Sequence, residues 1–191
     1  MSEAHLFALG IALAWIAGIR AYLTVFGAGL AGLLGWLDLP GQLVLCESPW
    51  VLGTAGVLTA VEFATDKIPG VDSVWDLLQT VVRIPAGAFL AGAALGDAET
   101  GLSTLGLVGG AGAAFTAHAL KSGTRALVNA SPEPVSNLLA SGSEDGLALG
   151  SLLFVFANPW LALLVVVVGS VLMFAAVYWL LRRLLPRRVA R

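Results

Sequence analysis

Long apolar runs, separated by short polar segments, make up most of the chain. A membrane-spanning helix needs about 20 mostly apolar residues, and several runs approach or exceed that length. These runs are 4–36, 49–64, 71–95, 102–128, 135–156 and 159–181. The last contains four consecutive valines and no charged residue, which is typical of a helix that faces lipid. The pattern predicts an all-α, polytopic transmembrane helix bundle of about six passes.

The first run, 4–36, is too long for one straight span. At 1.5 Å per residue it would extend about 50 Å, against a hydrocarbon core of roughly 30 Å. The run is interrupted at residues 18–20, Gly-Ile-Arg. This predicts a broken helix, either as one strongly tilted span with an interfacial tail or as two half-helices. Because proline lacks the backbone donor and disrupts helices, further breaks or kinks are expected at Pro69, Pro85 and Pro132.

Composition supports a membrane protein and excludes several other classes. Of the 191 residues, 58% are hydrophobic and 12% are charged, and the mean hydropathy is +0.91. Soluble domains carry roughly 25% charged residues. The net charge of −2 gives no reason to expect a nucleic-acid partner, and the single cysteine, Cys46, excludes an internal disulfide. We therefore expect one transmembrane domain over 1–191, with membrane lipids as partners and no cofactor.

The distribution of basic residues predicts the orientation. Arginines crowd the C-terminus, at positions Arg182, Arg183, Arg187, Arg188 and Arg191. Because cytoplasmic segments are enriched in Lys and Arg, the C-terminus is expected in the cytoplasm, in a multi-pass protein of the inner membrane. Counting back through six passes puts Lys67, Lys121 and Arg125 on the same side. The same count would place the N-terminus in the cytoplasm as well.

Two short sequences recur in the same order. Residues 17–21 (AGIRA) resemble 122–126 (SGTRA), and 48–50 (SPW) resemble 158–160 (NPW). The matches suggest repeat units 4–67 and 103–185, joined by 71–97. Internal repeats are common in transporters, where the binding site lies at the repeat interface on broken helices. The orientation of such a repeat, inverted or parallel, stays open.

The richest polar constellation surrounds a Pro-Gly turn between the second and third runs. Two pairs of carboxylates, each four residues apart, flank this turn: Glu62 with Asp66, and Asp72 with Asp76. Clustered carboxylates raise one another's proton affinity and can bind a cation. The alternative is a solvated loop in which Lys67 and Arg83 neutralise the acids. No known metal-binding signature is matched, so we expect no metal.

Arg20 lies deep in an apolar run and must be compensated. An unpaired arginine in a bilayer costs several kcal/mol, and Arg125 occupies the position that echoes it in the second repeat unit. We predict that both arginines converge with Glu62, Asp66 and Asp72 on one polar centre between the repeat units. Paired buried arginines favour an anionic group such as phosphate or carboxylate, whereas a purely structural ion pair is the alternative.

A third candidate segment follows the fourth run. Residues 131–134, Ser-Pro-Glu-Pro, cannot be helical throughout because a residue before proline avoids the α region. The helix start that follows would offer free N–H groups to an anion, although a plain connecting loop is the alternative. The candidate substrate-binding residues are Arg20, Glu62, Asp66, Lys67, Asp72, Asp76, Arg125, Asn129, Glu133, Ser136 and Asn137.

Other polar residues in the apolar runs allow more than one interpretation. Glu144 and Asp145 are either acids within the membrane or a sign that their segment is partly exposed, and His118 is more typical of a packed histidine than of a ligand. The chain contains no His-Glu-x-x-His, Gly-x-Ser-x-Gly or Walker motif, and we assign no catalytic residue.

Three function classes are compatible with this sequence. We expect a transporter or channel-like protein for a small solute or lipid-linked anion, using the buried polar centre. A non-enzymatic membrane scaffold or assembly protein is the second class, and an intramembrane lipid-acting enzyme is the third. A polar cavity lined by Arg20 and residues 62–76 would favour transport, whereas a dry interior would favour a scaffold. Glycine-rich surfaces are compatible with a homo-oligomer.

The polar motifs also carry a resemblance. Residues 18–22 (GIRAY), 61–73 (VEFATDKIPGVDS) and 125–134 (RALVNASPEP) resemble an uncharacterised family of bacterial membrane proteins, domain of unknown function 4126. The likeness extends over nearly the whole chain, and the DKIPGVD string is its most distinctive part. The resemblance implies a multi-pass membrane protein and implies no activity.

The predicted orientation can be tested at the C-terminus. A cysteine introduced at Arg191 should not react with a membrane-impermeant reagent added outside sealed cells, because the arginine-rich tail is expected in the cytoplasm. Efficient labelling from outside, with no reaction gained on permeabilisation, would contradict this orientation.

Overall fold

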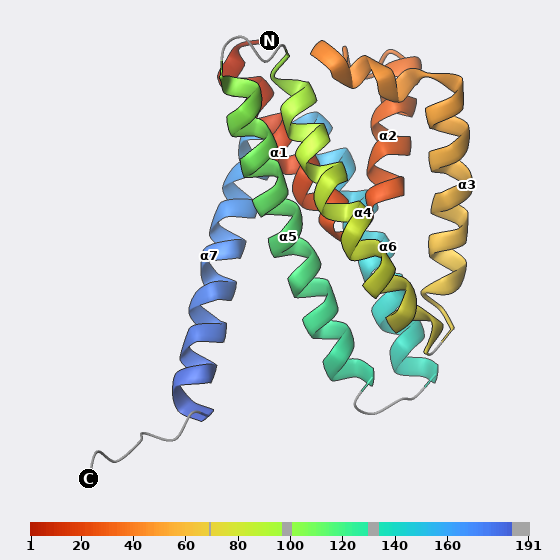
Figure 1. Ribbon diagram of the computed structural model, residues 1–191, viewed down its shortest axis with the longest axis vertical. Coiled ribbons are helices and arrows are strands. Elements are labelled where there is room, and N and C mark those ends of the chain that lie inside the picture. Colours follow the sequence, from red (N-terminus) through yellow and green to blue (C-terminus); the bar gives the residue numbers. More distant parts are fainter. Residues whose placement is uncertain (69, 97–100, 130–133, 185–191) are drawn as a thin grey trace.

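The computed structural model describes residues 1–68, 70–96, 101–129 and 134–184, without the side chains of residues 73, 126–129, 134–137, 177, 180, 181, 183 and 184. Over these ranges the regular structure is entirely helical, as the sequence predicts (Figure 1). The elements are α1 (Glu3–Ile19), α2 (Ala21–Leu33), the 3₁₀ helix η1 (Gly41–Glu47), α3 (Pro49–Thr65), α4 (Val71–Ala94), α5 (Leu102–Asn129), α6 (Pro134–Ala157) and α7 (Pro159–Leu184).

The first apolar run folds back on itself. Helix α1 ends at Ile19, Arg20 leaves the helical conformation with φ −143° and ψ 82°, and α2 begins at the next residue. Residues at the start of α1 (Met1 and Leu6) and residues 36–40, which follow α2, line one cavity of about 470 Å³. The outer ends of the two helices therefore lie together, and Arg20 forms the tip of a helical hairpin. Of the two alternatives, the structure has two half-helices.

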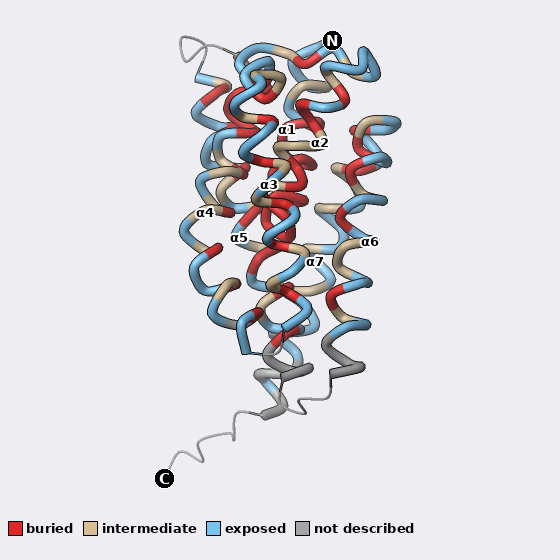
Figure 2. Tube along the Cα trace, turned by 90° about the vertical axis from the view of Figure 1, so that its right-hand side faces the viewer, coloured by how far each residue is buried: buried red, intermediate tan, exposed pale blue. Residues whose placement is uncertain are grey.

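Within the part of the chain that the structure describes, three helices are by themselves long and apolar enough to cross a membrane, fewer than expected. They are Val74–Ala94 in α4, Leu138–Ala157 in α6 and Pro159–Ala176 in α7. A fourth is obtained if η1 and α3, which meet at a bend of 68°, count as one span. The expectation of about six passes is therefore not confirmed. The N-terminus and the C-terminal end of α7 lie at opposite ends of the bundle (Figures 1 and 2).

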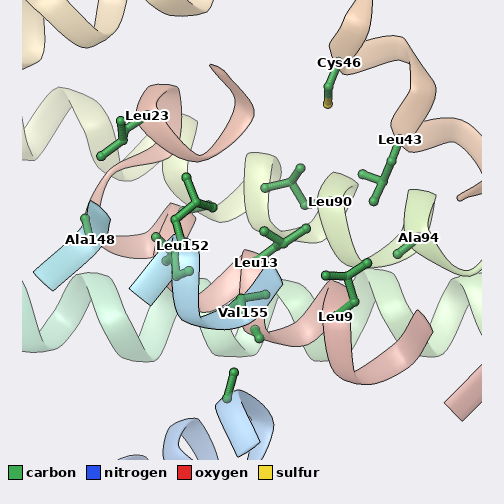
Figure 3. Close-up of a cluster of buried hydrophobic side chains, with 14 of the residues drawn as sticks. Leu9, Leu13, Leu23, Leu43, Cys46, Leu90, Ala94, Ala148, Leu152 and Val155 are labelled. Atoms are coloured by element: carbon green, nitrogen blue, oxygen red, sulfur yellow. The ribbon is translucent and has the colours of Figure 1, made fainter. Parts of the chain in front are cut away.

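Helix α1 is the centre of the apolar core. Nearly every residue of α1 from Ala8 to Ile19 is buried, as Figure 2 shows along its path. A helix that is apolar on all sides is stable only when other elements surround it. Around it lie Leu43 of η1, Leu90 of α4 and Leu152 of α6, which belong to one cluster of buried side chains (Figure 3).

Small residues let α1, α4 and α5 approach closely. A Cβ added to Gly18 of α1 would lie 2.7 Å from the Cβ of Ala117, and one added to Gly110 of α5 would lie 2.5 Å from the carbonyl oxygen of Gly87 in α4. Small residues at these positions allow close contact between the helices. A Cβ added to Gly112 would meet no atom within 4 Å. Residues two positions apart in a helix point about 200° away from each other around the helix axis. Gly110 and Gly112 therefore lie on different faces of α5.

Proline has different effects at different sites. Pro85 does not break its helix, since α4 continues through it from Val71 to Ala94; proline removes one hydrogen bond and leaves the rest of the ladder in place. Pro69 and Pro132 lie outside the described residues. The internal repeat stays a prediction: α3 and α7 both begin at a proline, but Arg20 interrupts a helix whereas Arg125 lies within α5.

The close contact of α4 and α5 can be tested with two substitutions on one helix. Gly110→Ala should lower the free energy of unfolding by about 1–3 kcal/mol because its Cβ meets backbone atoms. Gly112→Ala is the matched control. It should leave stability unchanged or raise it by up to about 1 kcal/mol, because alanine is the better helix former. Unfolding in detergent micelles measures both, and equal effects would contradict the contact.

Candidate functional site

Half of the charged residues of the chain form one connected network inside the bundle. Its cations are Arg20, Lys67, Arg83, Lys121 and Arg125, and its carboxylates are Glu62, Asp66, Asp72, Asp76, Glu144 and Asp145. The chain has 10 Lys and Arg and 12 Asp and Glu in total. All of its basic residues before Arg182 belong to the network, which is thus the main electrostatic feature of the fold.

Arg20 enters the network because the α1–α2 hairpin turns at this residue. Its side chain is fully buried. One guanidinium nitrogen lies 2.6 Å from the Asp66 carboxylate, and the other contacts Asp145 of α6. Two side chains also bind backbone carbonyls at the break between α1 and α2. The Thr24 hydroxyl donates to the carbonyl of Arg20 at 2.7 Å, and the Lys121 ammonium approaches the carbonyl of Ile19 at 3.5 Å.

Asp66, at the C-terminal end of α3, is the point where three cations meet. Its Oδ2 atom lies 2.6 Å from Arg20, 3.1 Å from Lys121 and 3.6 Å from Arg125. These cations come from the hairpin tip and from two successive turns of α5. A single buried carboxylate therefore joins α3 to both of these elements.

Arg83 of α4 forms the second centre of the network. It donates to Glu62 at 2.7 Å and to Asp76 at 2.9 Å, and a guanidinium nitrogen lies 3.1 Å from Nδ1 of His118. A guanidinium can only donate, so Nδ1 of His118 must be an acceptor. The proton of a neutral imidazole is then on Nε2, which lies 2.7 Å from the hydroxyl of Thr80. His118 is thus a packed, uncharged partner of the network.

Helix α6 is attached to the bundle through two adjacent acids. Glu144 accepts two hydrogen bonds from Arg125, at 2.8 and 2.9 Å, and lies 3.4 Å from Lys121. Asp145 contacts Arg20 and lies 3.2 Å from the Lys67 ammonium. Both carboxylates therefore belong to the polar interior and are only slightly exposed.

A cavity of about 240 Å³ lies between α1, α5 and α6 and reaches the network. Its walls are mostly apolar, with Trp15 and Ile19 from α1 and Leu120 from α5. Lys121 and Glu144 form its charged end. The lining of the cavity is amphiphilic, because one wall carries the ion pair of Lys121 and Glu144 and the other walls are mostly apolar.

One known family matches the chain over most of its length. A family model described as domain of unknown function (DUF4126) matches residues 7–182. The chain belongs to this family. No curated protein and no solved structure matches it. The DUF4126 match contains every member of the ion-pair network.

Within this DUF4126 domain, the structure brings most of the predicted site residues together. Arg20 and Arg125 converge with Glu62, Asp66 and Asp72 as expected. Asp76 joins them through Arg83, while Lys67 lies at the exposed edge. Burial of Glu62 and Asp66 excludes a solvated loop for these two residues. A role in binding substrate stays a prediction for the whole set. The remaining candidates lie outside the described residues: the side chains of Asn129, Ser136 and Asn137, and Glu133 entirely.

Four members of the network were missing from the candidate substrate-binding residues. They are Arg83, Lys121, Glu144 and Asp145. Spacing offered a signal for two of them: Lys121 precedes Arg125 by four residues, and Arg83 follows Asp76 by seven, so each pair shares a helix face. The contact of α6 with the α1–α2 hairpin had no such local signal.

Arg20 and Lys67 both contact Asp145, but removing each should change the free energy of unfolding by a different amount. Arg20→Ala should lower the free energy of unfolding by about 3–5 kcal/mol, because it takes from buried Asp66 its nearest cation and leaves Asp145 with Lys67 alone. Lys67→Ala also removes a contact to Asp145, but its side chain is 40% exposed, so the cost should stay below about 1 kcal/mol.

A double substitution tests the partner. The double variant Arg20→Ala with Asp145→Asn should lose less free energy of unfolding than the two single variants added together. The reason is that Arg20→Ala leaves the Asp145 carboxylate with Lys67 as its cation, and Asp145→Asn removes that charge. Strictly additive effects in chemical unfolding would show that Arg20 and Asp145 do not interact.

Proposed function

We propose that the protein is a membrane transporter or channel-like protein for a small solute or lipid-linked anion, and that the ion-pair network closes its pathway. The observation that carries this proposal is the fully buried arginine at the tip of a broken helix, inside a network of charges. Charged residues within an apolar bundle are costly and mark ion or substrate pathways. If the network only held helices together, apolar side chains of similar volume would often serve as well or better.

The arrangement supports a specific placement in the inner membrane. In this proposal α3 to α7 cross the bilayer and the α1–α2 hairpin enters from the side opposite to the end of α7, with the C-terminal arginines in the cytoplasm. The opposite positions of the N-terminus and the end of α7 support an odd number of crossings (Figure 1). Non-helical backbone is tolerated at membrane depth only where protein or a cavity surrounds it, and Arg20 meets this condition.

Helix α6 is the best candidate for the moving part. A Cβ added to Gly142, Gly146 or Gly150 would meet no atom within 4 Å, in contrast to the close packing of glycines between α1, α4 and α5. Charges and a cavity, rather than interlocked small residues, occupy its contact with α5. Ala148, Leu152 and Val155 hold the other half of α6 in the apolar core, so a competing ion would release the half that carries Glu144 and Asp145.

The cavity supplies the place for such competition. An anionic group that reached Lys121 and Arg125 would replace Glu144, exchanging an internal ion pair for an external one. The apolar walls suit a hydrocarbon tail, and the charged end suits phosphate or carboxylate. Arg20 is not among the cavity-lining residues, so in this proposal the structure is the closed form.

A scaffold function has two observations in its favour. Neither Arg20 nor any residue of 62–76 lines the cavities described above. Each cation of the network contacts a carboxylate within the chain, which is also what a purely structural interlock would give. The two functions differ in what happens when α6 is released. A transporter becomes leaky, whereas a scaffold only loses stability.

Flux through reconstituted protein tests the proposal. Glu144→Gln weakens the charge-assisted bonds to Arg125, each worth about 1.5–3 kcal/mol, and should therefore raise the efflux of at least one entrapped anion by about tenfold or more. Suitable probes are phosphate and acetate in sealed liposomes, with a headgroup-labelled anionic lipid for transfer between leaflets. Asp38→Asn, in the segment after α2 and outside the network, is the control and should leave flux unchanged.

If wild-type protein and Glu144→Gln both matched empty liposomes for every probe, while Glu144→Gln lowered the melting temperature, the scaffold function would replace transport.

A further inference from the structure

Glu62 is less well compensated than Asp66, its neighbour on the same face of α3. It is fully buried, and its Oε2 atom has no hydrogen-bond partner. Its Oε1 atom receives one close contact, 2.7 Å from Arg83, and lies 3.9 Å from Arg20. Asp66, one turn further along α3, contacts three cations through a single oxygen. The two acids thus share a helix and the same burial but differ sharply in their cationic partners.

The charges of the network do not balance. Six carboxylates face five cations among the described residues, and His118 adds no charge because its Nδ1 accepts from Arg83. A net charge in a buried site is unfavourable, and such groups usually become neutral instead. One carboxylate that holds a proton would make the network neutral. Oε2 of Glu62 and Oδ1 of Asp66 both lack a hydrogen-bond partner, but three cations surround the other oxygen of Asp66 and only one lies close to Glu62. The unpartnered oxygen together with the single close cation identifies Glu62 as that carboxylate.

Glu62 contacts Arg20 of the hairpin tip and Arg83 of α4 directly. The charged and titratable groups that contact these two cations, or one another, come from every neighbouring element: Asp66 and Lys67 after Glu62 on the chain, Asp76 of α4, His118 and Lys121 of α5, and Asp145 of α6. The two cations that contact Glu62 also bind other carboxylates. Arg20 lies closer to Asp66 and Asp145 than to Glu62, and Arg83 also binds Asp76. Neither of them is committed to Glu62 alone.

We propose that Glu62 is a proton-binding site and that its proton is the coupling ion of the transport cycle. The second half of this statement rests on the proposed transport function, whereas the first does not. The chemistry is a simple acid–base exchange. The Oε2 atom takes a proton from water on one side of the membrane, forming an O–H bond, and later returns it to water on the other side.

Arg20 links this proton to helix α6. When Glu62 loses its proton, a full negative charge appears 3.9 Å from a guanidinium that also holds Asp145. The new carboxylate competes for Arg20 and weakens its bond to α6. Uptake of the proton restores the closed arrangement. Proton binding and the position of α6 are thus coupled through one side chain.

Infrared difference spectroscopy of the protein in lipid vesicles tests the proton site directly. A neutral buried carboxyl group gives a C=O stretching band, separate from that of carboxylates, that shifts in D₂O and disappears when pH is raised. This band should be present in the wild type at neutral pH and lost in Glu62→Gln. It should remain in Asp66→Asn and in Asp145→Asn, a second control in case Asp66→Asn does not fold. Absence of the band, or its survival in Glu62→Gln, would overturn the proposal.

Two further measurements separate the proton site from the transport function. Because glutamine imitates a neutral glutamate, Glu62→Gln should keep the melting temperature of the wild type, while Asp66→Asn should lower it; a large loss in Glu62→Gln would contradict a neutral Glu62. In liposomes, an imposed pH gradient should change anion efflux through the wild type and have no effect on Glu62→Gln. If the pH gradient changed anion efflux equally in the wild type and in Glu62→Gln, the coupling role would be overturned, even with the proton site identified by the infrared band. Absence of any flux would count against the proposed function alone.

Discussion

The compensation of one buried arginine organises the structure. Arg20 is placed in the interior because the first apolar run turns back at this residue, and a guanidinium there cannot be left without carboxylates. Asp66 of α3 and Asp145 of α6 supply them. Two helices distant in sequence are therefore held to the same hairpin tip. Removing this interaction would take from Asp66 its nearest cation and leave Asp145 with Lys67 alone.

Two kinds of contact hold the helices together, close packing of small residues and buried ion pairs. Helices α1, α4 and α5 are joined through glycine and alanine contacts, as at Gly18 and Gly110, where a single added methyl group has no space. Such contacts are rigid, because dispersion forces between small residues fall off steeply with separation. The ion pairs of α6 act over longer distances and can exchange partners. The close packing therefore provides a fixed frame, and the charged contacts provide the part of the structure that can respond to an ion.

The carboxylates of the network are compensated to different degrees, which bears on proton exchange as well as on stability. Glu62 and Asp66 are neighbours on one helix face, yet one has a single close cation and the other has three. A shared low-dielectric environment strengthens both attraction and the penalty for uncompensated charge. Unequal compensation is the condition under which one acid of a cluster exchanges a proton while its neighbours stay ionised.

Local patterns in the sequence were sufficient for the helices and for part of the site. The long apolar runs predicted α3 to α7 to within a few residues, because helix formation follows apolar length and the positions of Pro and Gly, which are local properties. The energetic need of Arg20 for a carboxylate, with the short connection to α3, predicted its meeting with Glu62 and Asp66. The fold-back of α1 and α2 and the arrival of Glu144 and Asp145 were decided only by the tertiary structure. The reason is that a break at Arg20 fixes no direction for the following helix, and α6 is more than one hundred residues away in sequence, so its register against the hairpin depends on the packing of all the helices between them.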